Sequence, residues 1–68
     1  MIKIMDESMP FADGTQDVTF YADTKAECTD EAISALKPLD NISMGSKIYT
    51  KDLNIAIFDS SKNRTWKK

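Results

Sequence analysis

The sequence predicts a small α+β domain: a β-meander or hairpin sheet of four to five short strands with one short helix. Two observations carry this prediction. Residues 45–66 alternate apolar and polar side chains with period two between turn-rich breaks, which is typical of a β-meander. Residues 30–36 instead show helical spacing, and Pro38 ends that pattern because proline has no amide hydrogen to donate. With 68 residues, the chain is expected to be a single domain, residues 1–68.

Residues 1–16 are predicted to form an N-terminal strand and loop arm. Residues 1–5 alternate apolar and other side chains around Lys3, which suits an exposed edge strand. An Asp-Gly pair at 13–14 marks a turn, because glycine adopts positive φ without steric cost. Phe11 is the one apolar anchor expected in this loop.

Residues 17–68 are predicted to form the β-rich body, with its first strand over 17–23 and a helix near 30–36. Two starts for the helix remain open. In one, Thr24 and Glu27 form a capping box and the helix begins at residue 25, with Ala26, Thr29, Ile33 and Leu36 on one stripe. In the other, Thr29 or Asp30 is the N-cap and the acids at 30 and 31 lie near the positive end of the helix.

The last three strands are predicted around two polar turns, at residues 50–52 and 59–63, with the final strand over 64–68. The middle strand, residues 53–59, is apolar on both faces. That pattern indicates a central strand covered on both sides. On this interpretation Ile55→Asp unfolds the domain, because it buries an unpaired charge.

The size of the chain favours a protein that works in an assembly, and a marginally stable monomer is the alternative, because domains of this size also fold alone. A domain this small buries only about 60% of the surface of its unfolded chain. The sequence has one cysteine and no histidine, so neither an intrachain disulfide nor a zinc site can supply the missing stability. Binding to copies of itself or to a larger partner would supply it by mass action.

The net charge is −2 and the sequence pI is near 4.8, so nucleic acid is not expected as a partner. The charge is uneven: residues 1–31 contain eight acids and two bases, whereas residues 32–68 contain three acids and seven bases. No signal peptide and no membrane-spanning stretch is recognised, so we expect the chain to be made in a cytoplasm and to have no membrane partner.

No catalytic, cofactor-binding or metal-binding residues are predicted, and the chain is not expected to be an enzyme. Histidine, the usual acid–base group near neutral pH, does not occur in it. Cys28 has acidic sequence neighbours, which raise a thiol pKa and disfavour the reactive thiolate. It is more simply a small buried side chain of the helix.

The aromatic side chains of the predicted strands have three interpretations. In the first, they form the core. In the second, they form a stacking platform for single-stranded nucleic acid together with nearby lysines. In the third, they lie half-buried at a subunit contact. The core interpretation is favoured for the set as a whole. Residues with polar tips or in loops are the candidates for interaction: Tyr21, Tyr49, Trp66 and Phe11.

Two segments resemble a known group of proteins: FYADTKAE at residues 20–27, and MGS at 44–46 followed by a hairpin that ends in an acid, a polar turn and TW. Together and in this order they resemble small structural proteins of tailed bacteriophages and prophages. The later half also resembles short β-units at the ends of phage fibre chains. Where that group usually has an acid-Gly turn before the tryptophan, this chain has residues 60–64, SSKNR.

The resemblance implies a non-enzymatic structural component of a virion, made in the cytoplasm of the bacterial host. It implies a head-associated decoration or head-fibre-type protein that binds the capsid lattice, with the major capsid protein or copies of itself as partners. A tail or neck accessory protein is the nearest alternative. A further alternative is a small phage regulatory protein that binds a host factor through its acidic N-terminal half.

Overall fold

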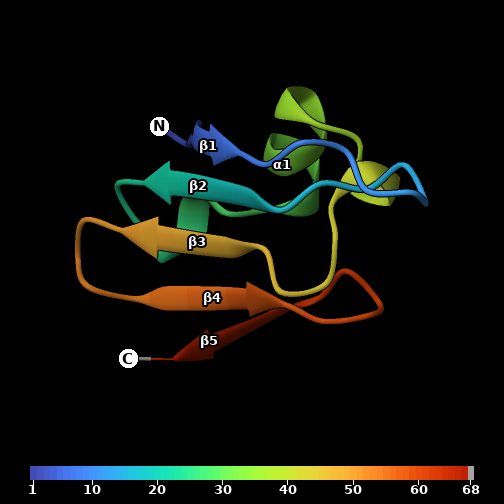
Figure 1. Ribbon diagram of the computed structural model, residues 1–68. Coiled ribbons are helices and arrows are strands. Elements are labelled where there is room, and N and C mark those ends of the chain that lie inside the picture. Colours follow the sequence, from blue (N-terminus) through green and yellow to red (C-terminus); the bar gives the residue numbers. More distant parts are fainter. Residues whose placement is uncertain (68) are drawn as a thin grey trace.

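The computed structural model describes residues 1–67, which form a mixed five-stranded sheet with the order β1-β2-β3-β4-β5 (Figure 1). One short α-helix and two 3-10 turns lie within the same range. The predicted α+β class is therefore confirmed. The strands are β1 (Lys3–Glu7), β2 (Val18–Ala22), β3 (Lys47–Thr50), β4 (Ile55–Phe58) and β5 (Arg64–Lys67); the helical elements are η1 (Lys25–Glu27), α1 (Asp30–Leu36) and η2 (Leu39–Asn41).

The sheet consists of two antiparallel pieces joined by a parallel pair. β1 and β2 form a hairpin, and β3, β4 and β5 form the predicted meander. β2 and β3 run parallel. Parallel neighbours need a crossover connection, and residues 23–46, which contain α1, provide it.

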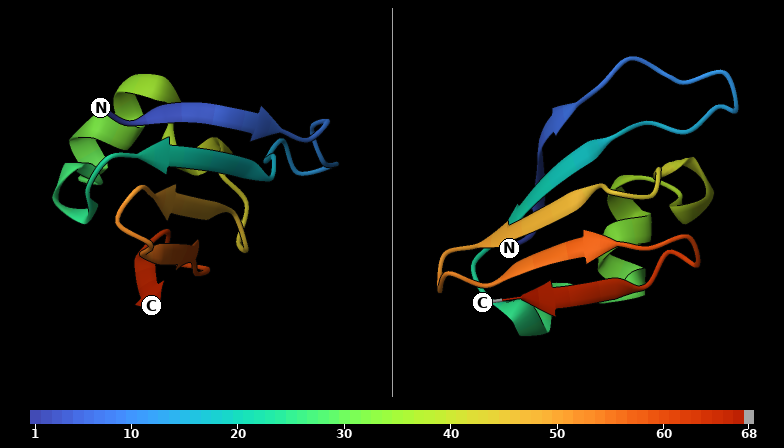
Figure 2. Two further views of the ribbon diagram at one scale, coloured as in Figure 1. Left: turned by 90° about the vertical axis from the view of Figure 1, so that its left-hand side faces the viewer. Right: turned by 60° about the horizontal axis from the view of Figure 1, so that its bottom comes forward.

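The connection between β1 and β2 spans residues 8–17 and extends beyond the end of the sheet (Figure 2). It is tied at its base, where the amide of Ser8 donates to the carbonyl of Asp17 at 2.8 Å. The amide of Gln16 also donates to the carbonyl of Asn41 at 2.8 Å. Residues 1–16 are thus a strand and a fastened loop.

The helix begins as the second alternative predicts. The Thr29 hydroxyl accepts a hydrogen bond from the amide of Ala32 at 3.1 Å, and α1 spans Asp30–Leu36. The Glu27 carboxylate accepts from the amide of Thr24 at 3.1 Å, but this contact closes the separate turn η1. The longer helix with a four-residue stripe is therefore wrong: its members Ala26, Thr29 and Leu36 are exposed. Ile33 is the helical residue that reaches the core.

The core lies between α1 and one face of the sheet. Phe20 of β2 and Phe58 of β4 are fully buried, with ring centroids 6.0 Å apart. Ile48 of β3 lies on the same face, and Ile33 and Ile42 cover it from the crossover. The buried hydrophobic set comprises Val18, Phe20, Ala22, Cys28, Ile33, Ile42, Ile48, Ala56 and Phe58.

β3, and not β4, is the central strand of the sheet. β4 alternates between buried Ala56 and Phe58 on the covered face and Ile55 and Ile57 on the other face. Ile55 is 36% exposed. The prediction of a β4 strand covered on both sides is therefore wrong, because the helical layer covers one face only.

The β3–β4 turn contains a strained residue that offers a test of the structure. Leu53 has φ 70° and is 79% exposed, so its backbone occupies the left-handed region and its side chain packs little. Left-handed backbone costs a non-glycine residue about 1–2 kcal/mol. We expect Leu53→Gly to raise the free energy of unfolding by about 1 kcal/mol, after the loss in chain entropy, and the melting temperature by about 4–8 °C.

Thermal unfolding followed by circular dichroism measures this gain. Lys51→Gly in the same turn is the matched control, because Lys51 does not have positive φ and gains nothing from glycine. A lower melting temperature for Leu53→Gly than for the unmodified chain would contradict the turn geometry.

Candidate interaction surface

The sheet has an open face, which is the face seen toward the viewer in Figure 1, with α1 and η1 behind the strands. Successive side chains of a strand point to opposite faces. In β2, the buried Phe20 points toward α1, so Thr19 and Tyr21 point away from it. The same alternation in β3 leaves Lys47 and Tyr49 exposed while Ile48 is buried.

The strand register aligns one row of side chains across the whole open face. Lys3 pairs with Tyr21 and Tyr21 with Tyr49. Tyr49 in turn pairs with Ile55, and Ile55 with Lys67. A second row runs beside the first through Asp6, Thr19, Lys47, Ile57 and Thr65. We call these two rows the open-face residues.

The middle of this face is accessible and, apart from Thr19 and Lys47, apolar. Tyr49 is 38% exposed, and Tyr21 and Ile57 are half-buried. These residues and Ile55 come from the three inner strands and form a continuous set in the register. Tyrosine combines a large rigid ring with a polar tip and is enriched in protein interfaces.

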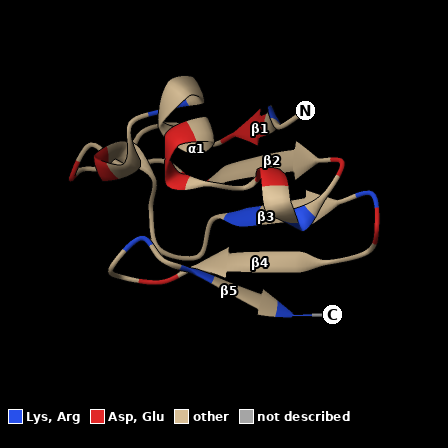
Figure 3. Cartoon of the chain, turned by 180° about the vertical axis from the view of Figure 1, so that it is seen from behind, with Lys and Arg blue, Asp and Glu red and all other residues tan. Residues whose placement is uncertain are grey.

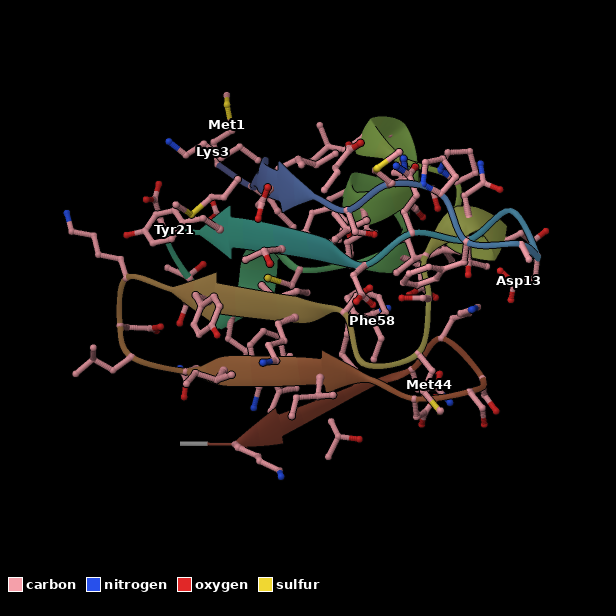
Figure 4. The ribbon with its side chains drawn as sticks, in the orientation of Figure 1. Met1, Lys3, Asp13, Tyr21, Met44 and Phe58 are labelled. Atoms are coloured by element: carbon pink, nitrogen blue, oxygen red, sulfur yellow. The ribbon has the colours of Figure 1, made fainter. Side chains whose placement is uncertain are left out.

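The margin of this face is basic. Lys3 lies on the edge strand β1 and Lys67 on the edge strand β5. The Lys3 ammonium is 5.9 Å from the centroid of the Tyr21 ring (Figure 4). This distance is within the range of a cation–π contact. With Lys47 in the second row, the open-face residues include three lysines against one aspartate, Asp6, in a chain whose net charge is −2.

The structure brings two of the four predicted interaction residues together. Tyr21 and Tyr49 are register partners on the open face. Trp66 pairs with Ala56, lies on the covered face and packs against the core, with the Lys25 ammonium 5.4 Å from its ring centroid. Phe11 lies in the loop 8–17 and is 46% exposed. Figure 4 labels Asp13 of the same loop, at the opposite end of the sheet from Tyr21.

The sequence analysis did not assign Lys3, Ile55 or Ile57 to an interaction surface. They can be placed on this surface from the alternation of side chains within β1 and β4, once it is known that the helix covers only one face of the sheet. Alternation alone does not say which face the helix covers. It also does not say that β2 and β3 pair, and that pairing puts Tyr21 beside Tyr49.

Several acids of the N-terminal half are held in ion pairs. The Met1 ammonium lies 2.8 Å from Asp23 and 2.7 Å from Glu27, which raises its pKa and lowers the pKa of both carboxylates. The Lys37 ammonium is 3.6 Å from Glu7, and Arg64 pairs with Asp30. Seen from the helical side, acidic residues also occur in several turns (Figure 3). The acidic half is thus spread over several elements and partly neutralised.

Cys28 is buried, and burial together with the charge of Glu27 raises the pKa of its thiol. A raised pKa leaves little of the nucleophilic thiolate at neutral pH. Across residues 1–67 no pocket is found, and no three metal-ligating side chains are grouped. The described helices include none that is long and apolar enough to span a membrane.

Comparison with known proteins adds no relative: no family model, curated protein or solved structure matches this chain.

Proposed function

We propose that this chain is a non-enzymatic structural component of a tailed-bacteriophage virion, and that it binds the capsid lattice as a decoration or head-fibre-type protein. The proposal combines the resemblance of residues 20–27 and 44–66 with one structural observation. That observation is the open sheet face, where Tyr21, Tyr49 and Ile55 offer apolar area to a partner. On this proposal the protein is made in the cytoplasm of the bacterial host and resides in the virion.

The open face suits a lattice-bound protein for an energetic reason. A 68-residue domain has a small core, and its stability rises with any partner that binds only the folded state. A covered open face would remove further apolar surface from water, at about 25 cal/mol per Å². The regulatory alternative, which uses the acidic half, has less support because Glu7, Asp23, Glu27 and Asp30 already have ion-pair partners.

Co-sedimentation with capsids tests the proposal. The purified chain is mixed with assembled capsids of the phage or prophage that encodes it, and the pellet is analysed by mass spectrometry. We expect the chain to pellet with capsids at a fixed ratio to the major capsid protein and to stay in solution without them. Sedimentation with isolated tails alone would favour the tail or neck alternative. Absence from both, and from purified particles, would refute a role in the virion.

A further inference from the structure

We infer that the open face binds a protein surface that is apolar at its centre and acidic at its margin, and that it does not bind a second copy of itself. This inference rests on the proposed function and names the chemistry of the partner. The argument uses the distribution of charge on the open face, the side chains at its centre and the consequences of pairing two such faces.

The layout of the open face is that of a protein interface. Two tyrosines and two isoleucines of β2, β3 and β4 occupy most of its centre, with Thr19 and Lys47 among them, and lysines stand on both edge strands. Interfaces between proteins have an apolar core and a polar rim, and tyrosines near the centre contribute most to affinity. Charges at the rim act mainly on partner choice and on the association rate.

The sign of the charges on the open face selects the partner. Lys3 and Lys67 lie at the two ends of one row, on the edge strands, and Lys47 adds a third positive charge in the next row, on the central strand β3. Two copies that pack face to face would bring the lysines of both faces together, with one aspartate per copy to offset them. Like charges brought together in this way repel, so the face disfavours its own copy. A partner with carboxylates around an apolar patch meets the same lysines with complementary charge.

A single-stranded nucleic acid would also meet tyrosines and lysines. The isoleucines of β4 argue for protein, because they are two of the four apolar side chains at the centre and offer no ring on which a base can stack. The net charge of −2 argues in the same direction, because nucleic-acid-binding domains are usually basic. We therefore treat nucleic acid as an outcome of the test.

Charge reversal on opposite faces of the molecule tests the inference. Lys47→Glu places an acid on the open face, and Lys25→Glu is the matched control on the covered side, where Lys25 lies over the Trp66 ring. Both substitutions change the net charge equally. In co-sedimentation with capsids, we expect Lys47→Glu and Tyr49→Ala each to raise Kd by at least about tenfold, which corresponds to about 1.4 kcal/mol, and Lys25→Glu to change it by less than about twofold.

A zero-length carbodiimide cross-linker adds a direct readout, because it joins an ammonium to a carboxylate that it touches. We expect Lys3, Lys47 or Lys67 to be coupled to aspartate or glutamate of the capsid protein, and this coupling to disappear at high salt. Circular dichroism of each variant verifies that it is folded before its binding is interpreted.

The possible results separate the two proposals. If the unmodified chain binds capsids and the open-face variants bind equally well, the virion role stands and the inference about the open face is overturned. If the unmodified chain does not bind capsids, the proposed capsid binding and the inference about the open face are both overturned. Light scattering that shows a dimer dissociated by Tyr49→Ala would assign the face to a second copy. Tighter binding to a thymidine oligonucleotide than to capsids, lost in Lys47→Glu, would assign it to nucleic acid.

Discussion

Phe20→Ala is expected to remove most of the stability of this protein. Phe20 is fully buried in the middle of the core, and its ring centroid lies 6.0 Å from that of Phe58. Replacing a buried phenylalanine by alanine costs about 3–5 kcal/mol, because the transfer energy is lost and a cavity remains. A domain of this length has a total free energy of unfolding of about 3–10 kcal/mol. We therefore expect a fall in melting temperature of at least about 12 °C, or no cooperative transition at all.

Phe11→Ala is the matched control for this experiment. It removes the same atoms, but from a loop residue that is 46% exposed. Its expected cost is below about 1 kcal/mol. Chemical denaturation measured by tryptophan fluorescence, with Trp66 as the probe, compares the two variants directly. Equal destabilisation by both substitutions would show that the core is not where the structure places it.

Ile48→Asp is expected to prevent folding. Ile48 is fully buried in β3, the central strand, between Phe20 and Ala56 in the register. A carboxylate there has no cation to pair with among the buried residues of this cluster, and it must either stay charged in an apolar environment or take up a proton. The expected cost exceeds about 4 kcal/mol, so circular dichroism should show an unfolded chain at neutral pH.

Ile55→Asp makes the same change on the other face of the sheet and should be tolerated. Ile55 is 36% exposed, and its register partner on β5 is Lys67. A new aspartate can face that lysine across the strands, so the cost is expected to be about 1 kcal/mol or less. This replaces the prediction from sequence, in which Ile55→Asp unfolds the domain. If Ile55→Asp unfolds and Ile48→Asp does not, the two faces of the sheet have been assigned the wrong way round.

Features encoded by neighbouring residues were predictable from the sequence. The helix Asp30–Leu36 has the predicted bounds, and its N-cap Thr29 belongs to the later of the two helix starts left open, which named Thr29 or Asp30. The strand at Val18–Ala22 and the three C-terminal strands also lie where alternation places them. Turns and caps depend on side chains a few residues apart, so local spacing is enough to find them.

Features that depend on distant segments were not predictable in this way. The apolar run in β4 indicates burial on both faces, yet Ile55 and Ile57 lie on the open face. Alternation identifies two faces of a strand but does not say what covers each of them. The candidate surface was predicted in part for the same reason: Tyr21 and Tyr49 were named singly, and the parallel pairing of their strands joins them.

The parallel pairing of β2 and β3 also determines when the open face exists. Tyr21 and Tyr49 come from different sides of the crossover 23–46, and only the closed sheet places them side by side. Each antiparallel piece taken alone, β1–β2 or β3–β5, contains one of the two tyrosines. A partner that needs both rings therefore distinguishes completed molecules from half-folded ones. In an assembly made of many copies, such recognition would exclude misfolded subunits, because only a subunit in which β1–β2 has paired with β3–β5 could bind.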